Sequence, residues 1–140
     1  MAATETATEP LSIGEVARRT GLSIDTLRFY ERERLLIGPV ERTAGGRRRY
    51  TAFDVEWLLI CVKLRESGMP LAELRRFADL VRSGPGNEAE RLALLDAHRQ
   101  RVDARIRELE DCRAVISRKV DIYAEHLARG DAAGLWDPTN

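Results

Sequence analysis

Residues 11–50 decide the fold: LSIGEVARRTGLSIDTLRFYERERLLIGPVERTAGGRRRY. Ser12 stands three residues before Glu15, which is the spacing of a capping box, and apolar residues follow at helical spacing. Gly21 can adopt the left-handed conformation that a tight turn between two helices needs. This part of the sequence therefore predicts a short helix that ends at Gly21.

A second helix is predicted from about Ile24 to Arg34, with Ser23 as its N-cap. A helix that enters the major groove of DNA needs short polar side chains near its N-terminus to reach base edges, and longer cations to hold phosphates. Thr26 and Arg28 fit these two roles. The segment is therefore the candidate recognition helix of a helix-turn-helix.

A basic hairpin is predicted after the second helix. Gly and Pro interrupt 35–40, which indicates an extended connector, and Gly45-Gly46 would turn the chain back. The returning strand would carry Arg47 to Tyr50 beside the duplex, where guanidinium groups bond phosphates or enter a narrow minor groove. We expect the DNA contacts of this winged helix-turn-helix to come from Ser12, Arg18, Ser23, Thr26, Leu27, Arg28, Tyr30, Arg32, Arg42, Arg47, Arg48, Arg49 and Tyr50.

The motifs of this stretch resemble the MerR family of transcription regulators. The resemblance rests on an ordered set, which is LSIGEVA at 11–17, TLRFYE at 26–31, LL at 35–36 and GRRRY at 46–50. Shorter matches follow the wing, so the specific part of the resemblance covers about residues 11–80. It implies a mainly α-helical fold, in which a winged helix-turn-helix module is followed by a helical linker and the long helix of an antiparallel coiled-coil dimer.

Charge is divided unevenly along the chain, although the whole chain is neutral. Residues 11–51 carry nine arginines against five acidic residues, a net charge of +4, whereas residues 1–10 and 52–140 carry −2 each. Positive potential confined to the proposed DNA-facing module favours nucleic acid over a membrane surface as the partner.

The N-terminal segment, the lack of long apolar runs and the small number of cysteines predict a cytoplasmic protein. Residues 1–10 are mostly Ala, Thr and Glu, which predicts a disordered tail and not a secretory signal. No apolar run approaches membrane-spanning length. The two cysteines, Cys61 and Cys112, give no disulfide framework.

Two further helices complete the predicted DNA-binding domain, which spans 11–83. Thr51 and Asp54 have the spacing of a capping pair for a strongly apolar helix that ends near Gly68, and Pro70 opens the next helix. A Gly-Pro-Gly segment then marks the main domain boundary.

Residues 87–129 predict a coiled-coil dimerisation helix, and 130–140 form a C-terminal tail. Apolar residues recur at alternating steps of three and four, and a single helix cannot bury such a seam. A second copy is the simplest partner. Arg99 and Arg113 interrupt the seam and would need carboxylate partners across the interface. The predicted dimerisation residues are Leu92, Leu95, Val102, Ile106, Leu109, Ile116, Val120 and Tyr123.

A two-fold dimer would present two recognition helices to an inverted-repeat operator in double-stranded DNA. The resemblance implies that such a sequence-specific regulator acts on promoter DNA together with RNA polymerase. It would distort an overlong promoter spacer, and a small-molecule or electrophile effector would shift the balance between the relaxed and distorted complexes.

In length and form the chain most resembles the subgroup that responds to aldehydes and other electrophiles through one cysteine after the wing. In that alignment the cysteine falls at Lys63, whereas this chain carries Cys61. This offset favours an inert core residue at Cys61, because burial raises the pKa of a thiol and hides the nucleophile. A thiol sensor at Cys61 is the alternative, which the nearby Lys63 and Arg65 keep open. We expect no metal site and no cofactor, and we expect His98 and His126 at the surface because two histidines without a carboxylate cluster are a weak metal signal.

Two other classes of protein are alternatives to a regulator. The first is a coiled-coil docking or assembly protein without catalytic activity, which would use the winged module for protein contacts. The second is an enzyme, but the sequence carries no nucleophile-base pair, phosphate loop or metal motif. We therefore predict that the protein is not an enzyme.

Overall fold

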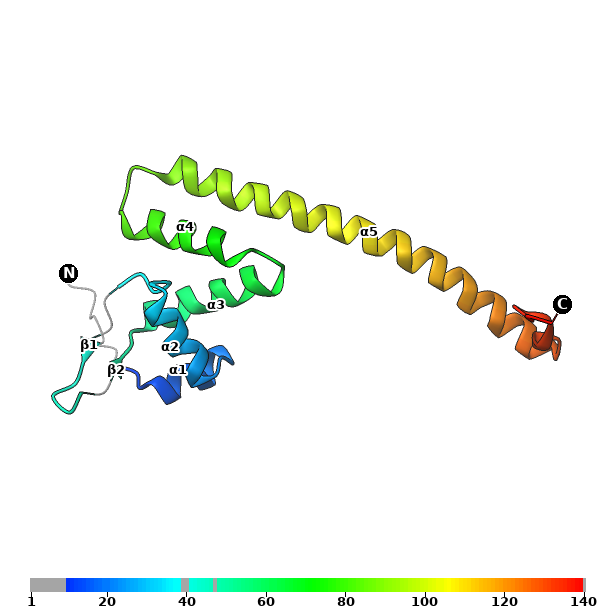
Figure 1. Cartoon of the computed structure of the whole chain (residues 1–140), viewed down its shortest axis with the longest axis horizontal. Coiled ribbons are helices and arrows are strands. Elements are labelled where there is room, and N and C mark those ends of the chain that lie inside the picture. Colours follow the sequence, from blue (N-terminus) through cyan, green and yellow to red (C-terminus); the bar gives the residue numbers. More distant parts are fainter. Residues whose placement is uncertain (1–9, 39–40, 47, 140) are drawn as a thin grey trace, which may run out of the picture. The chain divides into compact units, whose positions relative to one another are not determined.

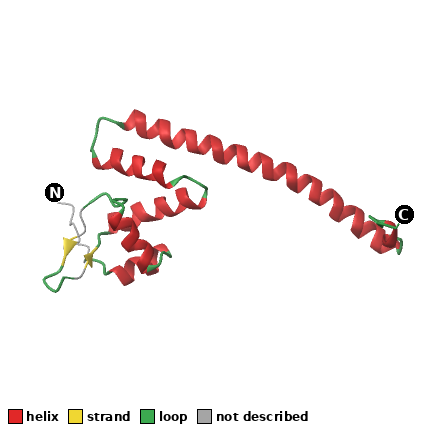
Figure 2. Cartoon of the chain, in the orientation of Figure 1, coloured by secondary structure: helices red, strands yellow, loops and turns green. Residues whose placement is uncertain are grey.

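The computed structural model describes residues 10–38, 41–46 and 48–139. Within these ranges the chain is mainly helical, with one small hairpin, as Figures 1 and 2 show. The elements are α1 (Ile13–Thr20), α2 (Ile24–Arg32), β1 (Glu41–Arg42), β2 (Arg48–Arg49), α3 (Ala52–Glu66), α4 (Leu71–Arg82), α5 (Glu88–Arg129) and η1 (Ala132–Gly134). The predicted disordered tail, except for Pro10, lies outside the described residues. The mainly α fold class is confirmed.

The helices α1 and α2 are joined by the turn that the sequence predicted, and Gly21 ends α1 with a φ of 76°. The N–H of Glu15 donates to the side chain of Ser12 at 3.2 Å. The carboxylate of Glu15 pairs with Arg18 and Arg19 on the following turn. The predicted capping box is therefore formed only in its first half, because the two arginines draw the carboxylate away.

The helix α2 ends at Arg32, earlier than the predicted Arg34. Arg34 has a φ of 55°, and this left-handed conformation cannot continue a right-handed helix. The N–H of Leu35 donates to the carbonyl oxygen of Tyr30 at 2.9 Å, which closes the end of the helix. The chain then enters an irregular connector that leads to the wing.

The wing is the hairpin in which β1 and β2 pair antiparallel. The N–H of Gly46 donates to the carbonyl oxygen of Thr43 at 2.9 Å, and Gly46 has a φ of 79°, which favours glycine. Backbone bonds of 2.8 and 2.9 Å join Leu11 to Tyr50. The base of the wing is therefore fixed to the segment that precedes α1.

The helix α3 lies against α1 and α4 and supplies much of the core. Thr51 and Asp54 form a complete capping box at its N-terminus, as predicted. The ring of Trp57 stacks on that of Phe77 from α4, with the ring centroids 5.5 Å apart. The most deeply buried side chains of the core are Tyr50, Leu27, Leu35, Leu58, Met69, Leu74, Val16 and Cys61.

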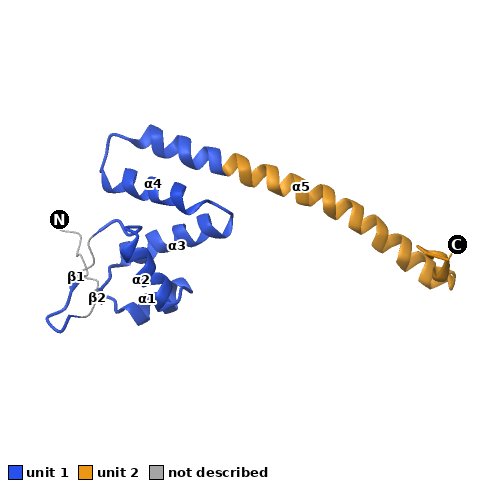
Figure 3. Cartoon of the chain, in the orientation of Figure 1, with its two compact units in different colours: residues 1–98 blue, residues 99–140 orange. Residues whose placement is uncertain are grey.

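The helix α5 is continuous over 42 residues, and the chain divides within it into two compact units, residues 1–98 and 99–140 (Figure 3). Its length and its apolar row fit the predicted coiled-coil helix. Most of the predicted dimerisation side chains are exposed in the single chain, and these are Leu92, Ile106, Leu109, Ile116, Val120 and Tyr123. Leu95 and Val102 are half-buried. None of the described helices combines the length and the apolar character that crossing a membrane requires.

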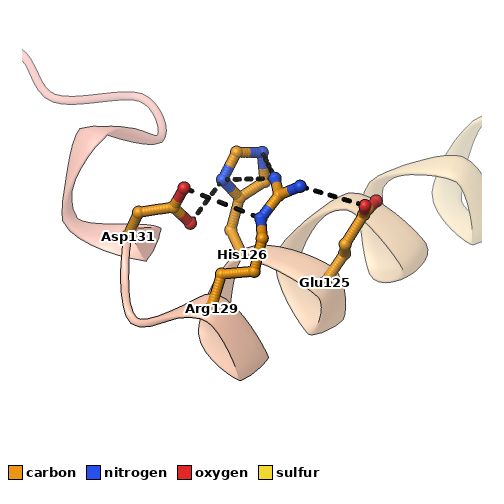
Figure 4. A network of polar contacts seen from close by, with 4 residues as sticks. All are labelled: Glu125, His126, Arg129 and Asp131. Atoms are coloured by element: carbon orange, nitrogen blue, oxygen red, sulfur yellow. Dashed lines mark hydrogen bonds and ion pairs between the residues drawn. The ribbon is translucent and has the colours of Figure 1, made fainter.

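A polar network closes the C-terminal end of α5 (Figure 4). Nδ1 of His126 lies 2.8 Å from Oδ1 of Asp131, and Nη1 of Arg129 donates to Oε1 of Glu125 at 3.2 Å. Gly130 follows the helix with a φ of 76°, and the N–H of Asp131 donates to the carbonyl oxygen of His126 at 3.0 Å. The backbone bond from Asp131 satisfies one of the last carbonyl groups of α5, and the left-handed Gly130 marks where the helix ends.

The prediction that His98 lies at the surface is wrong, because its side chain is only 5% exposed. Its Nε2 lies 2.8 Å from the hydroxyl oxygen of Ser67, which caps α3. The seam pattern alone did not reveal that the first turns of α5 belong to the first unit, where Leu94 and Leu95 pack against the core. His98 is therefore part of the packing between α3 and the beginning of α5.

Candidate nucleic-acid interface

Side-chain hydrogen bonds fix the turn between α1 and α2. The hydroxyl of Thr20 donates to the carbonyl oxygen of Val16 at 2.8 Å and accepts from the N–H of Leu22 at 3.2 Å. The hydroxyl oxygen of Ser23 accepts from the N–H of Thr26 at 3.1 Å. These bonds set the direction in which α2 leaves the turn, and therefore the surface that it presents to a partner.

The helix α2 has one face in the core and one face at the surface. Leu27 and Tyr30 are buried, whereas Arg28 and Arg32 are exposed and Thr26 is half-buried beside its cap. The exposed face carries the short polar and long cationic side chains that a recognition helix needs.

A carboxylate on α1 already holds one of the candidate cations. Arg18 is exposed and pairs with Glu15, which also accepts from Nε of Arg19 at 3.2 Å. The hydrogen bonds from Arg18 and then Arg19 lower the pKa of Glu15 below its ordinary value, so the carboxylate is charged at neutral pH. Exposed ion pairs are weak, so the Arg18–Glu15 pair leaves Arg18 able to bind another anion.

Arg42 connects the wing to the recognition helix. Its Nη1 donates to the carbonyl oxygen of Gly46 at 3.2 Å, and its Nη2 lies 3.5 Å from Oε1 of Glu31 on α2. Arg49 is half-buried on β2. Arg47 lies outside the described residues, and Arg48 is described only as a backbone member of β2. The wing and α2 are therefore held side by side through an ion pair.

Burial divides the predicted DNA contacts into two groups. The side chains of Leu27, Tyr30 and Tyr50 lie in the core, so they support the surface and do not reach a duplex in this conformation. The hydroxyl groups of Ser12 and Ser23 serve as N-caps. The candidate contacts whose side chains are exposed or half-buried are Ser12, Arg18, Ser23, Thr26, Arg28, Arg32, Arg42 and Arg49.

Sequence reasoning missed the residues that hold the connector between α2 and the wing. Nε1 of Trp57 donates to the carbonyl oxygen of Leu35, and Arg82 donates to that of Leu36. The partners come from α3 and α4 and are far from the connector in sequence. No local motif marks such a contact, so only the fold could reveal it.

Cys61, the candidate thiol sensor, is fully buried on α3. Burial raises the pKa of its thiol to about 12, so the thiol is protonated at neutral pH and lacks the nucleophilic thiolate form. Cys112 on α5 is exposed. Within the described ranges, no group of three or more His, Cys, Asp or Glu side chains could hold a metal ion.

The sequence matches two family descriptions over most of its length. Residues 11–80 match "MerR HTH family regulatory protein", and residues 55–118 match "MerR, DNA binding". The first match contains α1 to α4 except the last residues of α4, and the second extends into α5.

Individual relatives agree with these matches. An uncharacterized HTH-type transcriptional regulator of Haemophilus influenzae is 34% identical over 121 residues, which cover 86% of this chain and 89% of that protein. A mercuric resistance operon regulatory protein of Pseudomonas fluorescens is 32% identical over 126 residues, covering 89% and 83%.

The fold of the chain is also similar to that of a solved structure. HiNmlR, described as a MerR family regulator lacking the sensor domain and bound to promoter DNA, superposes with a TM-score of 0.78. The two are 31% identical, and the match covers 90% of this chain and 99% of that one. The family matches, the relatives and the shared fold agree, and the chain therefore belongs to the MerR family of transcriptional regulators, which are DNA-binding proteins and not enzymes.

Proposed function

We propose that the chain binds promoter DNA sequence-specifically, as a homodimer on an inverted-repeat operator, in the cytoplasm. The observation that carries the proposal is the exposed face of α2, where Thr26, Arg28 and Arg32 lie beside a basic wing. Of the thirteen DNA contacts that the sequence predicts, we propose only those whose side chains lie at this surface. HiNmlR, which shares the fold, is bound to promoter DNA.

In the proposed complex, α2 enters the major groove and the wing follows the phosphate backbone. Thr26 and Arg28 lie near the N-terminal half of α2, where side chains reach base edges. Arg42 and Arg49, together with Arg47 and Arg48, supply cations for phosphates. The net charge of +4 over residues 11–51 favours this orientation, because the rest of the chain is weakly acidic.

The proposed dimer is supported by the apolar row on α5. A helix of 42 residues extends about 63 Å at about 1.5 Å per residue. The row along it is exposed in the single chain, including Ile106, which is 48% exposed. A second copy that packs antiparallel would cover this row and place two recognition helices on opposite half-sites.

We further propose that the dimer controls transcription by distorting an overlong promoter spacer that RNA polymerase reads. Bending and untwisting DNA costs about 1–10 kcal/mol, and the contacts from two wings and two recognition helices would offset this cost. A small-molecule or electrophile effector would shift the balance by binding one of the two complexes, relaxed or distorted, more tightly than the other. The burial of Cys61 supports a role of that thiol in the core over a role in effector sensing.

Fluorescence anisotropy tests the DNA-binding proposal. Labelled DNA from upstream of the protein's own gene and a random duplex of equal length are each titrated with the purified protein over a series of salt concentrations. We expect tight binding to the upstream DNA at two chains per inverted repeat, with a log–log salt slope of about −0.9 per phosphate neutralised. Equal and weak binding to both duplexes would contradict the proposal and favour a docking or assembly protein.

A further inference from the structure

The connector between α2 and the wing is held by side chains from outside it. Residues 33–38 form no regular element, and Arg34 within them has a φ of 55°. Nε1 of Trp57 on α3 donates to the carbonyl oxygen of Leu35 at 2.6 Å. Arg75 on α4 pairs with Glu33. The connector therefore depends on α3 and α4 for its position.

Arg82 makes the most extensive of these contacts. Its Nη1 donates to the carbonyl oxygen of Leu36 at 2.8 Å and also to that of Arg34, while its Nη2 pairs with Asp79. The side chain is only 26% exposed. A planar guanidinium can serve two carbonyls and a carboxylate together, whereas a lysine ammonium is a point charge on a flexible stem. The site is therefore specific for arginine and not merely for a positive charge.

The same end of α4 is also tied to the beginning of α5. Nη2 of Arg91 donates to the carbonyl oxygen of Gly84 at 2.7 Å, and its Nε donates to Oδ1 of Asn87 at 2.7 Å. Nδ2 of Asn87 donates to the carbonyl oxygen of Leu80 at 2.7 Å. Arg82, the last residue of α4, thus lies between one set of bonds to the wing connector and another set to the first turn of α5.

From these contacts we infer that Arg82 is a positioning residue for the wing. It does not touch DNA. It fixes the connector, so that the wing and α2 engage the duplex together, and it joins the position of the wing to the first turn of α5. This inference rests on the proposed function, because the wing matters here as a phosphate-binding element.

A comparison of two substitutions separates positioning from direct contact. Arg82→Lys keeps the charge but not the fork of donors, and Arg82→Ala removes both. We expect each variant to bind the upstream DNA with about tenfold lower affinity. A loss of this size lies within the range of interaction energies for residues that share one hydrogen-bond network. Arg76→Ala is the matched control, because Arg76 is an exposed arginine on the same helix, and it should bind as the unmodified protein does. Thermal unfolding of each variant confirms that the protein is folded at the assay temperature.

A double-mutant cycle tests whether Arg82 acts through the wing. In a protein with Arg42, Arg47, Arg48 and Arg49 all changed to Ala, the phosphate contacts of the wing that Arg82 positions are already absent. Adding Arg82→Ala to that protein should cost less than about twofold. Full rescue of binding by Arg82→Lys, or an equal loss with and without the wing arginines, would overturn the inference.

Amide hydrogen exchange in the protein without DNA tests the positioning role of Arg82 independently of the proposed function. Arg82→Ala should speed the exchange of two N–H groups: that of Leu35, which lies in the connector and donates to Tyr30, and that of Gly46, which lies in the wing and donates to Thr43. Arg76→Ala should not change either rate. Unchanged exchange in Arg82→Ala would overturn the positioning role whether or not DNA binds. Failure of the unmodified protein to select its upstream DNA would instead contradict the proposed function.

Discussion

Nε1 of Trp57 donates a 2.6 Å hydrogen bond to the carbonyl oxygen of Leu35. Trp57 lies on α3 and its ring stacks on Phe77 of α4, with the centroids 5.5 Å apart, so one side chain joins the two helices to the connector of the wing. A buried carbonyl that loses its donor costs free energy, because no water replaces the bond. The contact therefore serves both the stability of the domain and the position of the wing.

Trp57→Phe tests the stabilising part of this relationship. Phenylalanine keeps an aromatic ring against Phe77 but cannot donate to Leu35, so the free energy of unfolding should fall by about 1–3 kcal/mol. Urea unfolding followed by circular dichroism measures the change. Trp136→Phe is the matched control, since Trp136 is 76% exposed and its replacement should have little effect. A loss of similar size in both variants would contradict the specific role of the Leu35 bond.

The raised pKa of the Cys61 thiol predicts how the free energy of unfolding changes at high pH. Burial raises the pKa of its thiol from 9.0 to about 12, so the unfolded chain loses this proton first as the pH rises. The protonated Cys61 therefore contributes fully to the free energy of unfolding below the ordinary pKa of the thiol. This contribution is lost as the pH rises from the ordinary to the raised pKa, and the free energy of unfolding falls by at most about 1.4 kcal/mol per pH unit. The free energy of unfolding of Cys61→Ala should fall less steeply over this range than that of the unmodified protein.

Thiol labelling gives an independent check of the same burial. At neutral pH a thiol reagent should modify the exposed Cys112 rapidly and should reach Cys61 only after unfolding. Rapid modification of Cys61 in folded Cys112→Ala would show that the thiol is accessible and would return it to the list of effector sites.

The sequence predicted the helix-turn-helix and the wing well because their signals are local. Caps such as Ser23 and Thr51, and a left-handed glycine such as Gly21, act within a few residues of one another. The end of α2 was placed too late because Arg34 has a positive φ, which nothing in the residue type or its local motif indicates. Local chemistry predicts such elements, whereas tertiary contacts adjust their ends.

The candidate site was predicted less completely than the fold. Motif position suggested Leu27, Tyr30 and Tyr50 as DNA contacts, but position in a motif does not distinguish a side chain that faces the core from one that faces solvent. Arg82 was missed because its partners are distant in sequence. His98 was misplaced because a seam pattern does not indicate which turns of a long helix pack on the preceding domain.

Ile106→Asp tests the proposed dimer. A carboxylate in the middle of the apolar row would be buried without a partner, so the protein should become monomeric in sedimentation equilibrium at micromolar concentration. Arg107→Asp adds the same side chain at the next position, outside the row, and should remain dimeric. A dimer that persists in Ile106→Asp would remove the argument from the seam.

Arg28→Ala tests whether the exposed face of α2 reads bases. If Arg28 contacts a base edge, the variant should lose about 1–3 kcal/mol of binding free energy on the operator and much less on random DNA. Anisotropy titrations on both duplexes measure the two losses. Arg48→Ala is the contrasting case, in which we expect similar losses on both duplexes and a salt slope smaller by about 1. Equal losses for Arg28→Ala would reassign Arg28 to a phosphate.

Glu15→Gln tests whether the carboxylate on α1 restrains the cations around it. The substitution removes the partner of Arg18 and Arg19, so both become available to phosphates. We expect tighter binding, with a salt slope that is steeper by about 1 for each arginine that gains a phosphate. The sign of the pH effect follows from the lowered pKa of Glu15: its ion pairs are intact above the ordinary value of 4.5 and are lost as acid protonates the carboxylate. Glu108→Gln, which removes the same charge from an exposed pair with Arg105, is the control. An equal gain in affinity from both substitutions would indicate a general charge effect and not the release of Arg18 and Arg19.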